Sequence, residues 1–599
     1  MTMNSNQSKR VSSSDYLMET MDGVAPNARY KKVTEEKAGG ATYTPKVLAD
    51  FVAKEVVGAA RFTPASGTIR LLDPATGDGE LLLSVLAQLV WRSVAAIEVH
   101  GFETDLPALN TAIARIKQSF PTVALHLTHG NFLDFVIDQV RPHDIGGLFE
   151  QEGAAPSYDL IIANPPYVRT QIMGAEQAQL LADQFGLAGR VDLYYAFIVG
   201  MAHVLKPSGI GGIIVSNRFM TTKSGGAVRQ AIREHFNVRH VWDLGDTKLF
   251  DAAVLPAVLL VEKHKGHERV SAGFTSIYAT DAEPTQHATD AIAALRCDGV
   301  VKIEDGRCFT VKNGTLDISA SADAVWRVAT VESDDWLSTV EAHTFQRFGD
   351  IGKIRVGVKT CADKVFIRTD WDEMPTAVRP DLLRPLTTHH MARRFRAGAG
   401  KKARFILYPH ESINGQRRAV DLATHPQSAA YLEQHRKTLE ARTYVIEGGR
   451  QWFEIWVPQD PACWDAPKLV FRDISEEPTF WLDLEGTIVN GDCYWLTSAK
   501  PEQTDHLWLA AAVANSSFIE TFYDHSFNNK LYAGRRRFIT QYVERFPLPA
   551  PALPSSRNIV ALAKQIYAAV GTSEANVFAA QLDGLIWEAF GVRPKEAAR

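Results

Sequence analysis

A short apolar run at 159–163 ends abruptly at Asn164, Pro165, Pro166 and Tyr167. Two consecutive prolines cannot donate to a strand ladder, so the run predicts a buried strand that stops here. The prolines also hold the Asn164 amide and the Tyr167 ring at the strand's C-terminal edge. An amide oxygen and a backbone carbonyl accept two hydrogen bonds from one planar amino group, and an aromatic ring stacks on the ring carrying it. The four residues predict a site for an exocyclic amine; a proline-terminated surface turn is the competing interpretation.

Residues 69–83 read as a strand, a turn and the start of a helix. The turn holds Gly77 and Gly79, which permit a tight bend and close approach of the backbone to a ligand at a helix N-terminus. Its acidic residues, Asp73 and Asp78, would repel a pyrophosphate. They suit a cationic sulfonium and a free amino group.

Polar residues end the next two predicted strands. Glu103 closes the first, at a position where a carboxylate commonly binds ribose hydroxyls in doubly wound folds. Asn131 and Phe132 follow the second, where we expect Phe132 to lie against an adenine ring and Asn131 to hydrogen-bond that ring's edge. Ordinary core packing is the competing interpretation for Phe132.

Strands and helices alternate through the segment that must position these residues. The alternation predicts an α/β, Rossmann-like domain over 41–265, with a doubly wound parallel sheet and right-handed crossovers. Thr44 before Pro45 is a candidate N-cap for a helix beginning at Lys46. Residues 1–40 are polar and predict a mobile tail.

Composition narrows the class of protein. The 599 residues are 46% hydrophobic and 22% charged, with net charge −5, which is typical of a globular chain with roughly two to four domains. The chain shows no membrane-spanning stretch and no secretory signal. Its five cysteines form no CxxC pair, which argues against zinc and disulfides. We expect a cytoplasmic protein that needs no metal.

These residues, in this order, resemble S-adenosylmethionine-dependent N6-adenine DNA methyltransferases of the gamma class, found in type II restriction-modification systems and as solitary methylases. The resemblance spans nearly the whole chain. It implies S-adenosylmethionine as cofactor, bound by Thr44, Asp73, Ala75, Gly77, Gly79, Glu103, Asn131 and Phe132. It implies catalysis by Asn164, Pro165, Pro166 and Tyr167.

The resemblance also implies a mechanism. Adenine leaves the duplex and stacks on Tyr167, while its amino group donates to the Asn164 side-chain oxygen and the Pro165 carbonyl. Orientation and electrostatics do most of the work, so no base is expected nearby.

The sequence departs from the family pattern at two places. The family usually has aspartate where Asn131 stands. It also often has an aromatic before the helix that begins near Ala227, where this chain has Ser224, Gly225 and Gly226, so Phe219 would have to substitute.

The second half lacks cofactor motifs and holds basic runs. We expect a connector with some strands at 266–345, a mixed α+β target-recognition domain at 346–555 and C-terminal helices at 556–599. Aromatics interleave the basic residues, which favours duplex DNA as partner over the competing interpretation of solvated faces. The candidate DNA contacts are Arg355, Lys359, Thr360, Lys364, Arg393, Arg394, Arg535, Arg536 and Arg537.

Several alternatives stay open at this point. An Asn-Pro-Pro-Tyr site also suits adenine in RNA, cytosine N4 or a protein glutamine amide, although a glutamine methylase would not need the additional basic half. A catalytically dead DNA-binding protein belongs to a different class, against which the intact motifs argue. We expect a monomer and, if a restriction endonuclease accompanies it, a separate chain.

Overall fold

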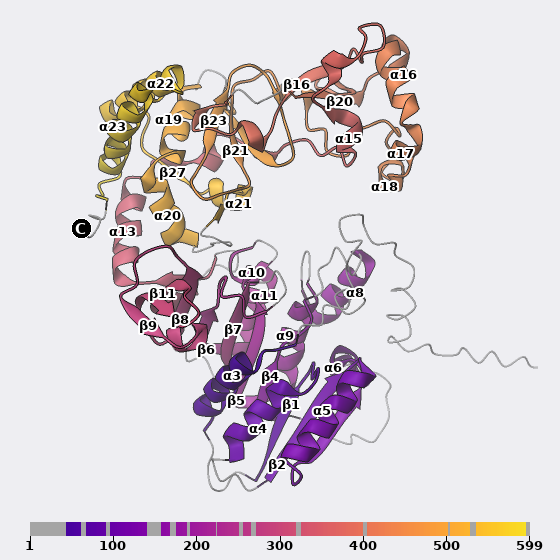
Figure 1. The fold of residues 1–599 in the computed structure, drawn as a ribbon, viewed down its shortest axis with the longest axis vertical. Helices are drawn as coiled ribbons and strands as arrows, with labels where there is room; N and C mark the ends of the chain where they lie inside the picture. The colour runs from indigo at the N-terminus through magenta and orange to yellow at the C-terminus, as the bar shows by residue number, and fades with distance from the viewer. Residues whose placement is uncertain are drawn as a thin grey trace, which may run out of the picture. The chain divides into compact units, whose positions relative to one another are not determined.

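The structure is a computed structural model of the 599-residue chain. It describes residues 43–61, 67–90, 96–140, 157–167, 175–187, 192–222, 225–250, 255–264, 271–318, 325–398, 404–500, 504–527 and 535–594. The predicted tail at 1–40 lies outside these ranges. The chain divides into two compact units, Met1–Ala329 and Thr330–Arg599, each described by itself below (Figure 1).

One twelve-stranded sheet organises the first unit. In spatial order its strands are β3 (Ala124–His129), β2 (Ala96–Glu103), β1 (Thr68–Asp73), β4 (Tyr158–Ala163), β5 (Leu205–Ser216), β7 (Pro256–Lys263), β6 (Phe236–Asp243), β8 (Gly273–Ala279), β11 (Cys308–Asp317), β10 (Gly299–Ile303) and β9 (Gln286–Ala288), with β12 (Arg327–Ala329) paired to β11. The five strands from β3 to β5 are parallel, as predicted. The carboxyl ends of β1, β2 and β4 therefore share one edge of the sheet.

The prediction of a wholly parallel sheet is wrong beyond β5. Strand β7 lies between β5 and β6 and runs antiparallel to both. No helix lies between β6 and β7 in the described part of that connection, so β7 returns alongside β6 in the opposite direction. The alternation of strands and helices along the sequence predicts each strand, but it does not predict which strands are neighbours in the sheet.

Helices cover both faces of this sheet, which confirms the doubly wound fold. Successive strand residues point to opposite faces: Leu71 joins one buried apolar cluster and Leu72 the other. The Leu71 cluster packs under α3 (Lys46–Ala59), α4 (Glu80–Val90), α5 (Leu106–Ser119) and α12 (Ala291–Ala294). The Leu72 cluster packs under α6 (Phe132–Val140), α8 (Ala175–Phe185), α9 (Leu193–Val204), α10 (Arg218–Thr221) and α11 (Gly226–His235).

The sheet continues past residue 265, where the sequence analysis ends the catalytic domain. Strand β8 pairs with β6, and β11 pairs with β8. Most of the segment expected as a connector is thus part of the first unit, which ends at Ala329.

The second unit is mixed α and β, as predicted. It begins with α13 (Val331–Ala342) and ends with the expected helix pair, α22 (Pro554–Ala569) and α23 (Ser573–Ala589). Its main sheet has the order β14 (Ile354–Val356), β25 (Cys493–Thr497), β21 (Lys468–Arg472), β23 (Phe480–Asp483) and β17 (Phe395–Arg396). A second sheet has the order β15 (Ile367–Arg368), β18 (Phe405–Leu407), β16 (Leu383–Thr387) and β24 (Ile488–Val489).

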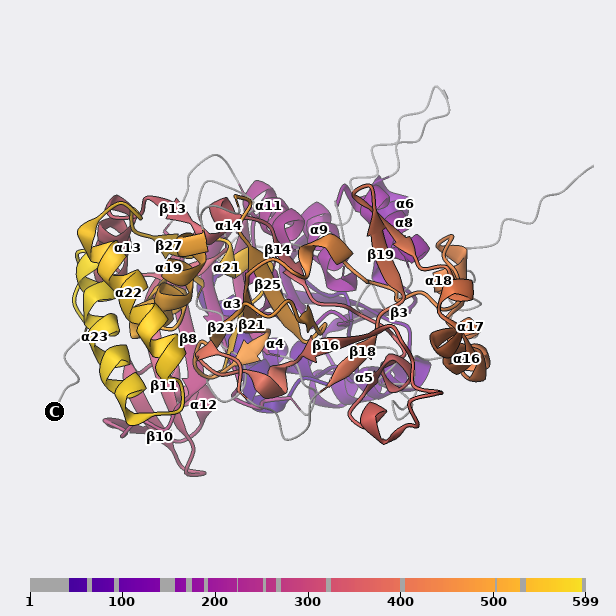
Figure 2. The same cartoon turned by 90° about the horizontal axis from the view of Figure 1, so that it is seen from above.

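The described part of this unit also holds three two-stranded ribbons, of which Figure 2 labels β13 and β27. They are β13 (Gln346–Arg347) with β27 (Pro547–Leu548), β19 (His410–Ile413) with β20 (Gln416–Ala419), and β22 (Ile474–Ser475) with β26 (Arg536–Arg537). The remaining helices are α14 (Phe348–Ile351), α15 (Asp363–Phe366), α16 (Pro426–Gln434), α17 (Arg436–Glu440), α18 (Thr443–Glu447), α19 (Thr504–Ala514), α20 (Ser517–Phe527) and α21 (Thr540–Val543). In neither unit does a described helix have the length and apolar character needed to cross a membrane.

Candidate active site

The glycine-rich turn follows β1 at the carboxyl edge of the sheet. Gly77 (φ +55°) and Gly79 (φ +85°) occupy left-handed backbone regions that favour glycine. A Cβ on Gly79 would lie 3.0 Å from Ala112 Cβ in α5. A Cβ on Gly101 in β2 would lie 2.3 Å from Thr76 Oγ1, so this glycine lets the turn pack against the neighbouring strand. The sequence analysis did not single out Gly101.

The carboxylate of Glu103 holds this turn in place. Its Oε2 accepts a hydrogen bond from the Gly77 N–H at 2.8 Å, and its Oε1 accepts one from the Asp105 N–H at 2.8 Å. Each carboxylate oxygen has a second lone pair. Glu103 can therefore order the turn and still accept from a ligand hydroxyl.

The carboxyl group of Asp73 is fully buried. Its Oδ1 accepts from the Ala75 N–H at 3.0 Å, whereas its Oδ2 has no hydrogen-bond partner among the described residues. Burial and, to a smaller degree, the negative charge of Glu103 raise the pKa of Asp73 to about 8. A buried acceptor without a partner is costly, so this oxygen suits a donor supplied by a ligand.

The structure corrects the interpretation of Asp78 as a carboxylate for a cationic ligand. Asp78 Oδ2 pairs with Arg115 Nη1 at 2.8 Å, and the same guanidinium reaches the Asp78 carbonyl at 2.9 Å and pairs with Glu80. Arg115 in α5 thus neutralises the acidic end of the turn. Its partners lie 35 and 37 residues away, so no local pattern pointed to it.

The amide of Asn164 lies at the end of β4 between two hydroxyl groups. Its Oδ1 accepts a hydrogen bond from the Tyr167 hydroxyl at 2.8 Å. Its Nδ2 donates to Thr44 Oγ1 at 3.0 Å. The two bonds fix the orientation of the amide plane, and the oxygen retains a second lone pair.

Thr44 was expected as a helix N-cap, and that expectation is wrong. The N-cap residue of α3 is Pro45, and no side-chain capping bond forms. The Thr44 hydroxyl instead faces Asn164, 120 residues along the chain. Local spacing cannot reveal a partner at that distance.

The ring of Tyr167 is partly buried beside α9. It meets the Tyr194 ring edge-on, with 6.2 Å between the centroids. Burial raises the pKa of the Tyr167 phenol well above its usual value, so the hydroxyl stays protonated as a donor.

Phe132 and Asn131 have structural roles in this arrangement. Phe132 is 1% exposed, and its ring packs between Phe102 and Phe197 at centroid distances of 5.7 Å. The structure thus favours the core-packing interpretation over contact with an adenine ring. Asn131 Oδ1 accepts from the Leu133 N–H at 3.0 Å, at the start of α6.

Phe219 cannot supply the missing aromatic in this conformation. It is fully buried, and its ring packs edge-on against Trp326 at 5.4 Å. Arg229, itself 1% exposed, fixes the same turn by donating to the Phe219 and Thr222 carbonyls. Gly225 and Gly226 begin α11, and Ser224 lies outside the described residues.

Comparisons with known proteins identify the family. Residues 104–250 match the Eco57I restriction-modification methylase family, and residues 420–548 match the TaqI-like C-terminal specificity domain. The chain is 37% identical over 576 residues to Type II methyltransferase M.BanIII of Aneurinibacillus aneurinilyticus, covering 93% of this chain and 98% of that protein. The chain belongs to the type II restriction-modification methylases.

Two further proteins agree with this assignment. The methylase is 26% identical to Type II methyltransferase M.XhoI of Xanthomonas vasicola, over 85% of this chain and 91% of that protein. Its fold resembles that of the Type IIL restriction-modification enzyme MmeI, solved in complex with DNA, with a TM-score of 0.55 and 13% identity over 92% of this chain and 73% of that one. The fold thus agrees with the family, and membership of the restriction-modification methylases makes DNA the substrate class of this chain.

The cofactor of the methylase is S-adenosylmethionine. This molecule carries a sulfonium, an amino acid group and a ribose, and the carboxyl edge offers groups that fit each. The Asp73 Oδ2 suits the amine, the glycine turn admits close approach, and Glu103 retains lone pairs for hydroxyls. When bound, the cofactor supplies an electrophilic methyl group.

The predicted DNA contacts fall into two groups, residues with partners inside the protein and exposed residues. Four of the arginines pair with carboxylates of the same unit. Arg536 is the most enclosed: its side chain is 12% exposed and binds Asp524 at 2.9 and 3.0 Å and Glu520 at 3.3 Å. The others are Arg537 with Asp473, Arg535 with Glu476, and Arg394 with Glu477 and Glu520.

Two further candidates also have structural partners. Thr360 is 1% exposed, and its hydroxyl lies between Asp363 and the Ala362 N–H at the start of α15, so its assignment to DNA is wrong. Arg355 stacks over the Trp495 ring at 5.2 Å. Lys359, Lys364 and Arg393 are exposed and make no ion pair with any described residue.

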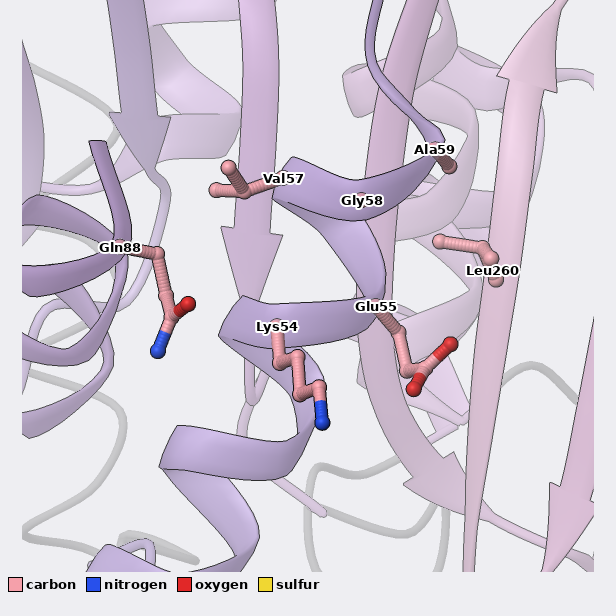
Figure 3. A pocket seen from close by; sticks show the side chains of 7 residues that line it. All are labelled: Lys54, Glu55, Val57, Gly58, Ala59, Gln88 and Leu260. Carbon is pink, nitrogen blue, oxygen red and sulfur yellow. The ribbon is translucent and has the colours of Figure 1, made fainter. Parts of the chain in front are cut away.

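A hollow of about 480 Å³ lies at the C-terminal end of α3 (Figure 3). It is lined by Lys54, Glu55, Val57, Gly58, Ala59, Gln88 and Leu260. These residues gather at the C-terminal end of α3, whereas Thr44 precedes its first turn. The hollow and Asn164 therefore lie towards opposite ends of this 14-residue helix. Across the described ranges, no three metal-ligating side chains cluster.

The raised pKa of Asp73 predicts a pH-dependent stability. Because the pKa in the folded protein exceeds its ordinary value of 3.8, this contribution is full below about pH 4 and is lost as pH rises towards about 8. In the wild type, the unfolding free energy should fall by up to about 1 kcal/mol per pH unit because of Asp73, and Asp73→Asn should remove this fall. Urea unfolding of both proteins between pH 5 and 8 measures it. Parallel pH profiles would contradict the assignment.

The Thr44 hydroxyl is expected to position the Asn164 amide. Thr44→Val keeps the shape but removes the bond, so kcat should fall about tenfold, as for the loss of one hydrogen bond of about 1.4 kcal/mol. Thr44→Ser should keep kcat near wild type. Single-turnover methylation measures the rate of methyl transfer, and a titration with S-adenosylmethionine measures cofactor affinity. Weaker cofactor binding with unchanged kcat would show instead that Thr44 binds the cofactor.

Arg536 should matter for stability rather than for DNA affinity. Arg536→Ala removes the largely buried guanidinium that binds both Asp524 and Glu520, so we expect a loss of about 3 kcal/mol in unfolding free energy. The neighbouring Arg535→Ala is the control, since its exposed pair contributes about 0–1 kcal/mol. Thermal unfolding measures both. An unchanged midpoint with a flatter salt dependence of DNA binding would restore Arg536 to the interface.

Proposed function

We propose that the methylase transfers the methyl group of S-adenosylmethionine to the N6 amine of an adenine flipped out of duplex DNA. The observation that supports this most directly is the Asn164 amide, held at the end of β4 by the Tyr167 and Thr44 hydroxyls. Strand β4 is the direct neighbour of β1, whose end carries Asp73. A substrate amine and a methyl donor would thus meet at one edge of the sheet.

The amide supports an amine substrate because the bonds to Tyr167 and Thr44 fix which end of the side chain is the acceptor. An amide oxygen can accept more than one hydrogen bond, so Asn164 Oδ1, which accepts from the Tyr167 hydroxyl, would also accept from an N–H of the substrate. With the Pro165 carbonyl as the second acceptor, the amino nitrogen becomes more tetrahedral and its lone pair points away from the base plane. With the cofactor bound, the nitrogen would form a bond to the methyl carbon as the sulfur–carbon bond breaks and leaves its electron pair on sulfur, and the nitrogen would then release one proton to water.

The Tyr167 ring would support the unstacked base. Flipping one base costs a few kcal/mol, and stacking on an aromatic face offsets part of this. Tyr194 contacts Tyr167 edge-on, which limits rotation of the ring. The same amide would accept a hydrogen bond from the N4 amine of cytosine, so the identity of the base is part of the proposal.

We further propose that the methylase acts as a monomer, alongside a separate restriction endonuclease that recognises the same target sequence.

Substituting Asn164 tests the proposed chemistry. Asn164→Ala should lower methyl transfer to background while leaving affinity for duplex DNA within about twofold, because a bond to the amine forms only during catalysis. Asn558→Ala, an exposed amide on α22, is the matched control and should retain full activity. Digestion of methylated DNA to nucleosides with mass detection identifies the product.

The outcomes separate the alternatives. N6-methyladenine from the wild type, absent with Asn164→Ala, supports the proposal. N4-methylcytosine would refute the choice of base, and turnover by Asn164→Ala would refute the role of the amide.

A further inference from the structure

The ribbon β19–β20 carries exposed side chains that the proposed function does not yet use. The pairing register sets Glu411 opposite Arg418, Ser412 opposite Arg417 and Ile413 opposite Gln416. Asn414 (φ +51°) and Gly415 (φ +73°) form the connecting turn, and both positive angles are typical of a type I′ hairpin. Residues 413–418 are all exposed, and a Cβ on Gly415 would meet nothing within 4 Å. The turn is a free tip.

The base of this hairpin is firmly attached to the second unit. His410 is 5% exposed, and its Nε2 accepts a hydrogen bond from the Ile455 N–H at 3.1 Å. Burial lowers the pKa of His410 to about 3, so the ring stays neutral and keeps this acceptor. The adjacent Tyr408 hydroxyl donates to the Pro458 carbonyl at 2.7 Å. A rigid base makes the exposed tip a preorganised element.

The two faces of the hairpin differ. Residues paired across antiparallel strands share a face, so Arg417 and Ser412 lie on the face of the buried His410, where Arg417 Nη1 reaches the Gln459 carbonyl at 3.5 Å. Arg418 and Gln416 lie on the opposite face, turned away from the unit. Arg417 and Arg418 make no ion pair with any described carboxylate. This contrasts with Arg394 and Arg535 to Arg537, which are paired.

One further cationic side chain, that of Lys359, is connected to the base of the hairpin through the backbone. Gln459 also donates through Nε2 to the Val356 carbonyl at 2.7 Å, which joins this base to β14. Lys359 exchanges two backbone hydrogen bonds of 3.0 Å with Val457, two residues before Gln459, and its side chain is exposed. Lys359 is therefore a second exposed cation near Arg417 that could contact a phosphate backbone.

We propose that the β19–β20 hairpin enters the major groove of the DNA target and that Arg418 and Gln416 read base edges there. The inference rests on the proposed function, in which duplex DNA is the substrate. A two-stranded ribbon fits a major groove about 12 Å wide and about 8.5 Å deep, and three steps from His410 to Ile413 span about 10 Å. Arginine pairs bidentately with guanine, and glutamine with adenine. Arg417 and Lys359 contact phosphates and position the duplex.

Conservative and charge-removing variants distinguish residues that recognise bases from residues that contact phosphates. The target is first mapped by methylating genomic DNA with the wild type, followed by modification-sensitive sequencing. Arg418→Lys keeps the charge but loses the bidentate fork, so it should bind random duplex DNA within about twofold of wild type. It should also methylate sites that differ at one base pair at least about tenfold better relative to the target. Gln416→Ala should relax a neighbouring position.

Arg417→Ala should behave differently. Binding should weaken on every duplex, and the slope of log affinity against log salt should fall by about 1. Arg557→Ala, an exposed arginine on α22, is the charge-matched control and should change neither the target nor the slope. All four variants alter exposed side chains, and thermal unfolding should match the wild type.

Two results would overturn the proposal. An unchanged target and affinity for an Arg418→Ala, Gln416→Ala double variant would remove the hairpin from the interface. A uniform loss on all sequences with Arg418→Lys would reduce it to a phosphate contact. The test is independent of the base that is methylated: N4-methylcytosine from the wild type would refute the proposed function, while the choice of site would still report on the hairpin.

Discussion

The candidate site depends on one constraint, the fixed orientation of the Asn164 amide. Two prolines stop β4 at this residue, and hydroxyls from Tyr167 and Thr44 hold the two ends of its side chain. A freely rotating amide would present its nitrogen as readily as its oxygen, and a donor facing an amine substrate repels it. The surrounding residues thus convert an ordinary polar side chain into a directed acceptor.

The sheet brings this acceptor beside the cofactor groups. Because β1 is the parallel neighbour of both β2 and β4, Asp73, Glu103 and Asn164 reach the same edge from segments far apart in sequence. Glycines at 77, 79 and 101 let the intervening turn pack closely, and Arg115 neutralises its acidic end. The buried Asp73 Oδ2 has no hydrogen-bond partner among the residues that the structure describes, as expected at a place where a ligand completes the hydrogen bonding.

The second unit contains two kinds of arginine: some are paired with carboxylates, and others are exposed and could contact DNA. Arg536 and Arg537 come from a run of three arginines, yet each is held by carboxylates that arrive from other elements. Arg417 and Arg418 come from a less basic stretch, yet they stand on an exposed hairpin without such partners in the described structure. The density of charge along a chain is therefore a poor guide to the surface it forms, since folding decides which charges are neutralised.

Features set by neighbouring residues were determined by the sequence alone. Asn164 to Tyr167 at a strand end, the glycine turn, the doubly wound class and the C-terminal helix pair follow from backbone restriction and periodicity, which act over a few residues. The tertiary structure decided what depends on distant partners. It turned Thr44 from a helix cap into a support for Asn164, moved Phe132 and Phe219 into the core and paired Asp78 with Arg115. It also inserted β7 between β5 and β6 and extended the sheet to Ala329. Packing selects such partners among many of similar local propensity, so only the assembled fold distinguishes them.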